Sequence, residues 1–255
     1  MLFTDKLTTN KMLYAICAFI VVVFAFSAAE QVPLPPITIC KRNSDNYSDC
    51  LKAAIKEAWP QFVKGLPEFD FPSLDPITFE FGNAVFDNGP IHGVVNVSNF
   101  IIEGFAKTRF LGVRSHFDDK IFQLDIDIQI PQIAGSGEVN AVGILGGFRM
   151  GGNGLVNVTL EDLHGTWIMK GHVANDTWTV EDYYAAPSPK NMKVYFENLF
   201  NGNKELNDLA MVFVNEYWPL LYRIIIPIGA DTWNPWLCDL VNRFFSKVSF
   251  KEIFP

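Results

Sequence analysis

The chain has 255 residues, of which 49% are hydrophobic, and it carries 20 basic against 28 acidic side chains, a formal net charge of −8 at pH 7. A hydrophobic content near one half is ordinary for a globular protein. The acidic balance favours solubility and argues against nucleic acid or an anionic membrane as the main partner.

The first residues have the pattern of a secretory signal peptide. Lys6 and Lys11 precede an uncharged apolar run from Met12 to Phe26, which is shorter than the roughly 20 residues that a membrane-spanning helix needs. The small residues Ser27, Ala28 and Ala29 follow. We therefore predict that residues 1–29 are removed and that residues 30–255 form a single secreted domain; a retained membrane anchor is the alternative.

Three cysteines remain in the predicted mature chain, namely Cys40, Cys50 and Cys238. Cys40 and Cys50 enclose a short polar loop before a helical pattern, which in an oxidising compartment indicates a disulfide. The alternative is a zinc site, but no second Cys or His pair stands at ligand spacing. We expect Cys238 to be a buried thiol rather than half of an intermolecular bridge.

Tripeptides of the form Asn-X-Ser/Thr, without proline in the middle, mark acceptor sites for N-linked glycans. They begin at Asn46, Asn96, Asn157 and Asn175. Behind a signal peptide, these sequons predict a secreted glycoprotein.

The apolar residues after the cysteine loop recur at helical spacing. Leu51, Ile55, Ala58, Phe62 and Leu66 stand three or four residues apart. This predicts an amphipathic helix over residues 48–65, which the glycine and proline that follow bring to an end.

From about residue 77 to residue 197 the period changes to two, which is typical of strands. Phe122, Leu124, Ile126, Ile128 and Ile130 alternate with polar residues. Further strands are expected over 91–102, 104–113, 137–148, 155–163, 165–174 and 192–197, with turns at 87–90, 151–154 and 175–176. We expect the glycines of 143–154 to mark bulges or bends. The order predicts an antiparallel meander with one polar and one apolar face.

The helical period returns at Asn203. One apolar stripe comprises Leu206, Leu209, Ala210, Phe213, Tyr217, Leu220 and Ile224. We expect Pro219 and Pro227 to interrupt it, and a last helical segment over 236–247. A long helix of this kind can cover the dry face of the sheet. If side chains fill the space between helix and sheet it is a core, and if they do not it is a tunnel for an apolar guest.

No pattern in the sequence points to an enzyme. There is no G-x-S-x-G, H-E-x-x-H, P-loop or G-x-G-x-x-G motif in its required setting. His92, His116, His164 and His172 stand singly. His164 and His172 could meet across a hairpin as a metal pair, but two solvated strand histidines are the simpler interpretation. We therefore expect neither enzymatic activity, nor a metal, nor a cofactor.

Several segments resemble the takeout and haemolymph juvenile-hormone-binding proteins of insects. They are the loop between Cys40 and Cys50, Gly65-Leu66-Pro67, the PSLDP segment at 72–76, the ENLFNGNKEL segment at 197–206 and the FFSKVSFKEIF ending at 244–254. The resemblance implies an α+β fold in which a strongly curved antiparallel sheet wraps a long helix and encloses an elongated hydrophobic tunnel. It also implies an extracellular carrier of juvenile hormone or another apolar molecule, with circadian or behavioural roles in some members. A single disulfide is nearer to the takeout type, which puts juvenile hormone in doubt as the ligand.

The predicted lining of the ligand site consists of large apolar residues on the expected dry faces. They are Trp59, Phe62, Phe69, Phe71, Phe122, Leu124, Ile126, Ile128, Phe148, Trp167, Phe196, Phe213, Tyr217 and Trp218. The alternative for each is ordinary core packing. We expect a monomer without stable membrane insertion.

Two other functions remain open. One is a secreted signalling protein that acts through a cell-surface receptor, with its tunnel packed. The other is a lipid exchanger at a membrane surface, with a tunnel mouth at 33–36 or 233–236.

Overall fold

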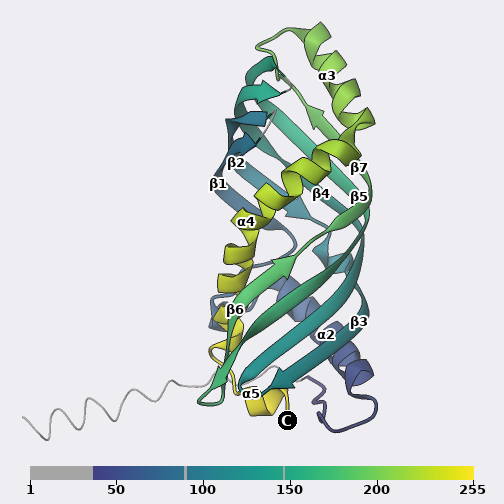
Figure 1. Ribbon diagram of the computed structural model, residues 1–255, viewed down its shortest axis with the longest axis vertical. Coiled ribbons are helices and arrows are strands. Elements are labelled where there is room, and N and C mark those ends of the chain that lie inside the picture. Colours follow the sequence, from purple (N-terminus) through teal and green to yellow (C-terminus); the bar gives the residue numbers. More distant parts are fainter. Residues whose placement is uncertain (1–36, 89–90, 146) are drawn as a thin grey trace, which may run out of the picture. The chain divides into compact units, whose positions relative to one another are not determined.

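A computed structural model describes residues 37–88, 91–145 and 147–255. The predicted signal peptide and residues 33–36 lie outside the described residues. The first helix of the described residues is α2 (Tyr47–Lys64), close to the predicted bounds, and a 3-10 turn, η1 (Pro67–Phe69), follows it. The sheet comes next, and three helices complete the chain (Figure 1).

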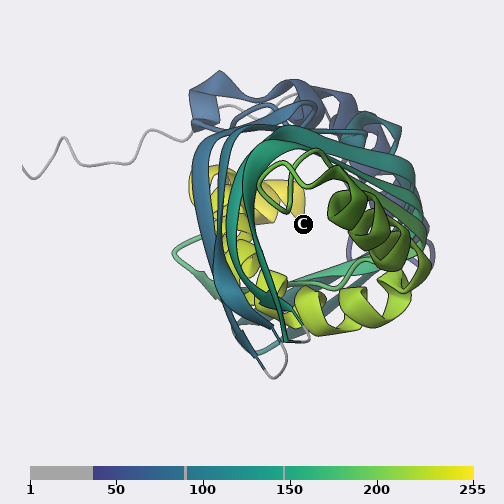
Figure 2. The same cartoon turned by 90° about the horizontal axis from the view of Figure 1, so that it is seen from above.

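Within the described residues, seven antiparallel strands form one sheet. They are β1 (Ile77–Asn88), β2 (Ile91–Glu103), β3 (Arg109–Asp118), β4 (Ile121–Leu145), β5 (Phe148–Ala174), β6 (Thr177–Ala185) and β7 (Ser188–Phe196). Strands β4 and β5 are 25 and 27 residues long and pair along their whole length. Each has two further neighbours, β3 and β2 for β4, and β6 and β7 for β5. The sheet curls strongly, as Figure 2 shows. The predicted α+β class with a curved antiparallel sheet is confirmed, whereas the tunnel stays a prediction.

Some predicted strand boundaries are wrong. The segments 122–130 and 137–145 belong to one strand, because β5 continues to pair on both sides of Pro131. The segment predicted at 137–148 runs too far, since β4 ends at Leu145 and Phe148 already begins β5. The expected strand at 104–113 begins instead with the 3-10 turn η2 (Phe105–Lys107), and β3 starts at Arg109. His164 and His172 both lie on β5, so no hairpin brings them together. The turn at Asn175-Asp176 is confirmed, with positive φ angles of 52° and 62°.

The turn expected at 151–154 is also wrong, because these residues lie within β5. Glycine there allows another segment of the chain to approach the backbone of β5 closely. A Cβ on Gly152 would stand 1.8 Å from the carbonyl oxygen of Asn198, in the segment after β7. The chain reverses just before β5, where Gly147 has a φ of 88°. Glycine is thus required by packing between segments, which a single-sequence pattern does not reveal.

Helix α3 (Lys204–Glu216) is followed by α4 (Trp218–Phe245) and the short α5 (Phe250–Ile253). α3 and the first part of α4 are bent by 80° relative to each other. The predicted break near Pro219 is therefore confirmed, with that proline in the first turn of α4 where its missing N–H costs nothing. The break predicted at Pro227 is wrong, since α4 runs through it.

Buried side chains gather at both ends of the β4–β5 ladder. At one end, Phe122 and Trp178 pack with Phe250 and Phe254 of the C-terminal segment. At the other end, Val139, Val156 and Phe196 pack beneath residues of α3. The C-terminal part of α4 also joins α2 and η1, with the ring of Phe244 centred 5.0 Å from Phe62 and 4.8 Å from Phe69.

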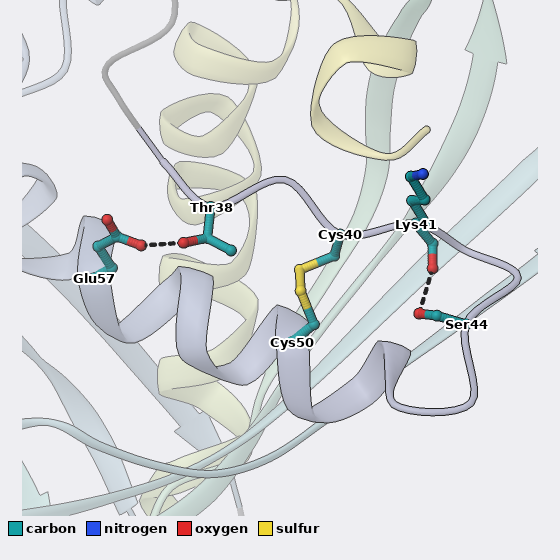
Figure 3. The surroundings of a disulfide bond; sticks show 6 residues. All are labelled: Thr38, Cys40, Lys41, Ser44, Cys50 and Glu57. Atoms are coloured by element: carbon teal, nitrogen blue, oxygen red, sulfur yellow. Dashed lines mark hydrogen bonds between the residues drawn. A yellow bond between two sulfur atoms is a disulfide. The ribbon is translucent and has the colours of Figure 1, made fainter.

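The predicted disulfide is confirmed. Cys40 and Cys50 are bonded, with their Cα atoms 5.7 Å apart (Figure 3). The bond ties the segment before α2 to the first turns of that helix, and Thr38 donates a hydrogen bond of 2.6 Å to Glu57 further along it. Arg42 in the loop donates its backbone N–H to the carbonyl of Pro255 at 3.0 Å. The two ends of the domain are thus held together.

Candidate apolar ligand site

Helix α3 lies along the free edge of β7. One face of α3 accepts hydrogen bonds from backbone N–H groups of β7 and of the segment after it. Asn215 accepts from Val194, Met211 from Phe196, and Asn207 from Leu199. With 3.6 residues per turn, the opposite face of the helix carries Leu206, Leu209 and Phe213. Figure 2 shows α3 within the curve of the sheet, and because its other face contacts β7, this opposite face points away from that strand.

The apolar face of α3 continues across the bend into α4. We call Leu206, Leu209, Phe213, Tyr217 and Leu220 the helix stripe. These five side chains are between 46% and 67% exposed. Scattered apolar residues on a surface are ordinary, but a contiguous stripe marks a site that binds something apolar.

A second group of large apolar side chains lies deeper along the curve. Trp59 of α2 packs edge-on against Phe110 of β3 at 5.4 Å and against Trp167 of β5 at 5.6 Å. Its indole N–H donates to the carbonyl of Phe105 at 2.9 Å. Phe79 of β1 packs on Trp236 of α4 at 5.7 Å. All five aromatic side chains of these three contacts are only partly buried.

The structure divides the predicted lining residues into groups. Phe213 and Tyr217 belong to the helix stripe, whereas Trp59, Phe62, Trp167 and Trp218 are partly buried. A third group is closed off by the chain's own packing, each member being at most 6% exposed; it comprises Phe69, Phe71, Phe122, Leu124, Ile126, Ile128 and Phe196. The side chain of Phe148 lies outside the described residues. A ligand contact remains a prediction for every one of them.

Sequence reasoning left several residues of this region out of the predicted lining. Leu206, Leu209 and Leu220 stand in the helical stripe that the sequence shows, and that spacing was the signal for them. Phe79 had no such signal, because its contact with Trp236 joins residues that are far apart in the sequence. The tunnel mouth suggested at 233–236 does not match the exposed apolar surface. Trp233 and Trp236 lie within α4 and are partly buried.

The polar groups near α4 are mostly engaged with the edge of the sheet. Tyr222 donates a hydrogen bond of 2.7 Å to the carbonyl of Pro187, and burial raises its pKa to about 12. Burial also raises the pKa of Tyr183, which faces α4 from β6. These phenols therefore stay neutral at physiological pH.

Cys238 is a free thiol in α4, as expected, and it is partly buried. Its Sγ donates to the carbonyl of Val180 at 3.2 Å. Burial raises its pKa, and the carboxylates of Asp182, Asp239 and Glu181 add to the effect. The thiol form is thus favoured at neutral pH, and the nucleophilic thiolate is scarce.

Other chemistry is sparse in this part of the chain. Among residues 37–88, 91–145 and 147–255, no three His, Cys, Asp or Glu side chains are grouped to hold a metal ion. Three histidines each contact one nearby carboxylate: His92 contacts Asp87, His164 contacts Asp162 and His172 contacts Glu181. Within the same ranges no single helix is long and apolar enough to cross a membrane, and only α3 with the first part of α4, as a bent pair, reaches that length and composition.

Comparison with known proteins accounts for this arrangement. A family model described as haemolymph juvenile hormone binding protein matches residues 19–255. The chain belongs to this family. The family predicted from the motifs of the sequence is therefore confirmed.

Two known proteins show how similar the chain is to its relatives. The chain is 22% identical over 239 residues to the circadian clock-controlled protein daywake of Drosophila melanogaster, covering 89% of this chain and 90% of daywake. The crystal structure of Takeout 1 from Epiphyas postvittana superposes with a TM-score of 0.71 at 21% identity, covering 86% of this chain and 99% of Takeout 1. At this identity the likeness establishes the haemolymph juvenile hormone binding protein fold, namely helices set against a curled antiparallel sheet.

Proposed function

We propose that the protein is a secreted, extracellular carrier that holds a small apolar ligand between the curled sheet and helices α3 and α4. The observation that carries this proposal is the helix stripe, a row of five large, half-exposed apolar side chains on α3 and the start of α4. Family membership and the Cys40–Cys50 disulfide, which forms in oxidising compartments, support it.

Affinity in such a site comes from removing apolar surface from water. A guest that buries 300–400 Å² gains roughly 7–10 kcal/mol at about 25 cal/mol per Å², before the entropic cost of binding is subtracted. The neutral phenols and the uncharged stripe impose no ionic requirement on the guest. We therefore expect a lipid with a long apolar body, such as a terpenoid ester or a fatty acid, rather than a small charged metabolite.

The test is native mass spectrometry of the protein secreted from insect cells, followed by organic extraction of what travels with it. The expected result is a bound species of a few hundred daltons, which a fluorescent fatty-acid probe or a juvenile hormone analogue displaces. A mass equal to the unliganded glycoprotein, together with no probe binding, would contradict the proposal and would favour a receptor-binding protein with a packed interior.

A further inference from the structure

Strand alternation shows which side chains lie on the side of the sheet away from the core, at the end of the sheet near α3. Successive side chains of a strand point to opposite faces. Val95, Val97, Val139, Ala141 and Val156 pack in the cluster beneath α3. Their neighbours in sequence therefore point away from the core, and we call the surface that they form the outer face.

The outer face carries apolar side chains in register. Val85 pairs directly with Val94, and Val94 with Val142, across strands β1, β2 and β4. Phe81 and Leu155 lie in another row, which also contains Ser98 and Glu138. Val85, Val142 and Phe81 are 62–69% exposed. A soluble protein that leaves such a patch uncovered is prone to self-association.

Asparagines separate these two apolar rows. Asn83, Asn96, Asn140 and Asn153 are paired in turn across β1, β2, β4 and β5. Asn96 is the first residue of a sequon, Asn96-Val97-Ser98. A second sequon begins at Asn157, two residues from Leu155 on the same face of β5 and directly opposite the exposed Tyr195 of β7. Two of the four sequons thus lie among the exposed apolar side chains of one sheet face.

Two surface hollows lie beside these sequons. One of about 680 Å³ is lined by Val142, Asn140 and Asn153, and Asn140 is the direct neighbour of Asn96. The other, of about 470 Å³, is lined by Asn157, Thr159 and Tyr195. Each hollow offers apolar carbon and amide groups together. This is the combination that a sugar ring uses, through its C–H faces and its hydroxyls respectively.

We propose that N-linked glycans on Asn96 and Asn157 cover the apolar outer face and keep the protein monomeric. The proposal rests on the secretion proposed above, because the modification takes place in the secretory pathway. In each case the Asn Nδ2 bonds to C1 of the first N-acetylglucosamine, that carbon's bond to a lipid pyrophosphate donor breaks, and the amide proton leaves with the pyrophosphate. The exposed Asn46 and Asn175 stand in turns at the start of α2 and between β5 and β6, outside the paired rows.

The first step of the test is glycopeptide mass spectrometry on protein secreted from insect cells. We expect glycans on Asn96 and Asn157. The second step compares Ser98→Ala, which removes the acceptor sequence but keeps Asn96, with the matched change Ser48→Ala at the Asn46 sequon. We expect Ser98→Ala to bind an apolar fluorescent dye several-fold more strongly and to elute partly as larger species, whereas Ser48→Ala behaves as the unaltered protein.

Two further preparations separate the glycan from the substitution. Trimming of the unaltered protein with an endoglycosidase is expected to reproduce the effect of Ser98→Ala. Adding Val85→Thr and Val142→Thr to Ser98→Ala is expected to reverse it. Unoccupied Asn96 and Asn157, or equal dye binding by the Ser98→Ala and Ser48→Ala proteins, would overturn the proposal. Native mass spectrometry of the same samples also shows whether a ligand is bound. A protein with occupied Asn96 and Asn157 but no bound ligand would contradict the carrier function and leave the role of the glycans standing.

Discussion

Three asparagine side chains take the place of missing strands at the edges of the sheet. Asn242 of α4 accepts from the backbone N–H of Val180 at 2.8 Å and donates to its carbonyl at 2.7 Å. Asn215 of α3 does the same for Val194, with both distances 2.8 Å. Asn207 accepts from Leu199 and donates to Phe196. An amide carries one acceptor and two donors, so it satisfies an edge residue as a paired strand does.

Replacement of Asn242 by alanine is expected to lower the free energy of unfolding by about 2 kcal/mol. The backbone N–H of Val180 loses its partner in a largely buried place, and its carbonyl keeps only the weaker bond from the Cys238 thiol. Chemical denaturation followed by tryptophan fluorescence measures the change. The matched control is Asn140→Ala on the outer face, where the side chain is exposed and the expected effect is below about 0.5 kcal/mol. Equal effects in the two variants would refute the role assigned to Asn242.

Asp176 joins the β5–β6 turn to the C-terminal helix α5. Its carboxylate accepts from the hydroxyl of Ser249 at 2.6 Å and from the N–H of Lys251 at 3.0 Å. The hydrogen bond from Ser249, with that from Lys251, holds the pKa of Asp176 below its usual value despite some desolvation. A carboxyl with a depressed folded-state pKa stabilises the fold above its unfolded pKa of about 3.9, and this contribution is lost as the pH falls through the lower, folded value.

We therefore expect Asp176→Asn, which leaves the Asn175 sequon intact, to have a lower thermal midpoint than the unaltered protein at pH 7. Below about pH 4 the two midpoints are expected to approach each other. Thermal unfolding recorded from pH 3 to pH 7 measures this. A midpoint difference that stays constant with pH would show that the charge of Asp176 contributes nothing.

At the scale of single elements, helix α3 makes different use of its two sides. One side closes the edge of β7, and the other carries the helix stripe. The exposed residues of the helix include charged ones such as Glu205 and Glu216, but the helix stripe leaves large apolar side chains exposed among them. This arrangement is understandable if a guest covers the stripe.

Phe213→Asp is expected to weaken binding of an apolar probe at least tenfold, because the bound ligand would have to desolvate a carboxylate. The control is Val212→Asp; this neighbouring residue is also exposed but lies about 100° further round the helix. Probe titration of both variants gives the comparison, with circular dichroism to verify folding. Equal loss of affinity in both would place the ligand elsewhere.

At the scale of the whole domain, β4 and β5 form the continuous frame on which everything else is placed. One end is closed by the aromatic cluster around Phe122 and Trp178, and the other end carries α3. The helix stripe on α3 and α4 remains half-exposed. The domain therefore buries less apolar surface on its own than it would with a guest in place.

Ligand binding is accordingly expected to stabilise the domain as a whole. A ligand at one hundred times its Kd adds about 2.7 kcal/mol to the free energy of unfolding when it binds only the folded state. Differential scanning fluorimetry on protein stripped of lipid, with increasing amounts of a terpenoid or fatty acid, is expected to show a midpoint that rises with the logarithm of the concentration. A midpoint that does not respond to any apolar ligand argues against the carrier function.

The amino-acid sequence was sufficient for the features that depend on short spacings. It predicted α2, the Cys40–Cys50 bond, the Asn175-Asp176 turn and the family. Periodicity and turn residues act within a few positions, so neighbouring residues already contain that information.

Other features were decided by tertiary structure. The continuity of β4 past Pro131, the close approach at Gly152 and the pairing of asparagines with strand edges all join residues far apart in the chain. The same holds for the candidate site. Phe122 and Phe213 have equally apolar patterns, yet Phe122 is sealed by Trp178, Phe250 and Phe254, whereas Phe213 stays half-exposed on α3. Which apolar side chains remain uncovered depends on what distant segments pack against them, because burial is a property of the folded chain and not of local spacing.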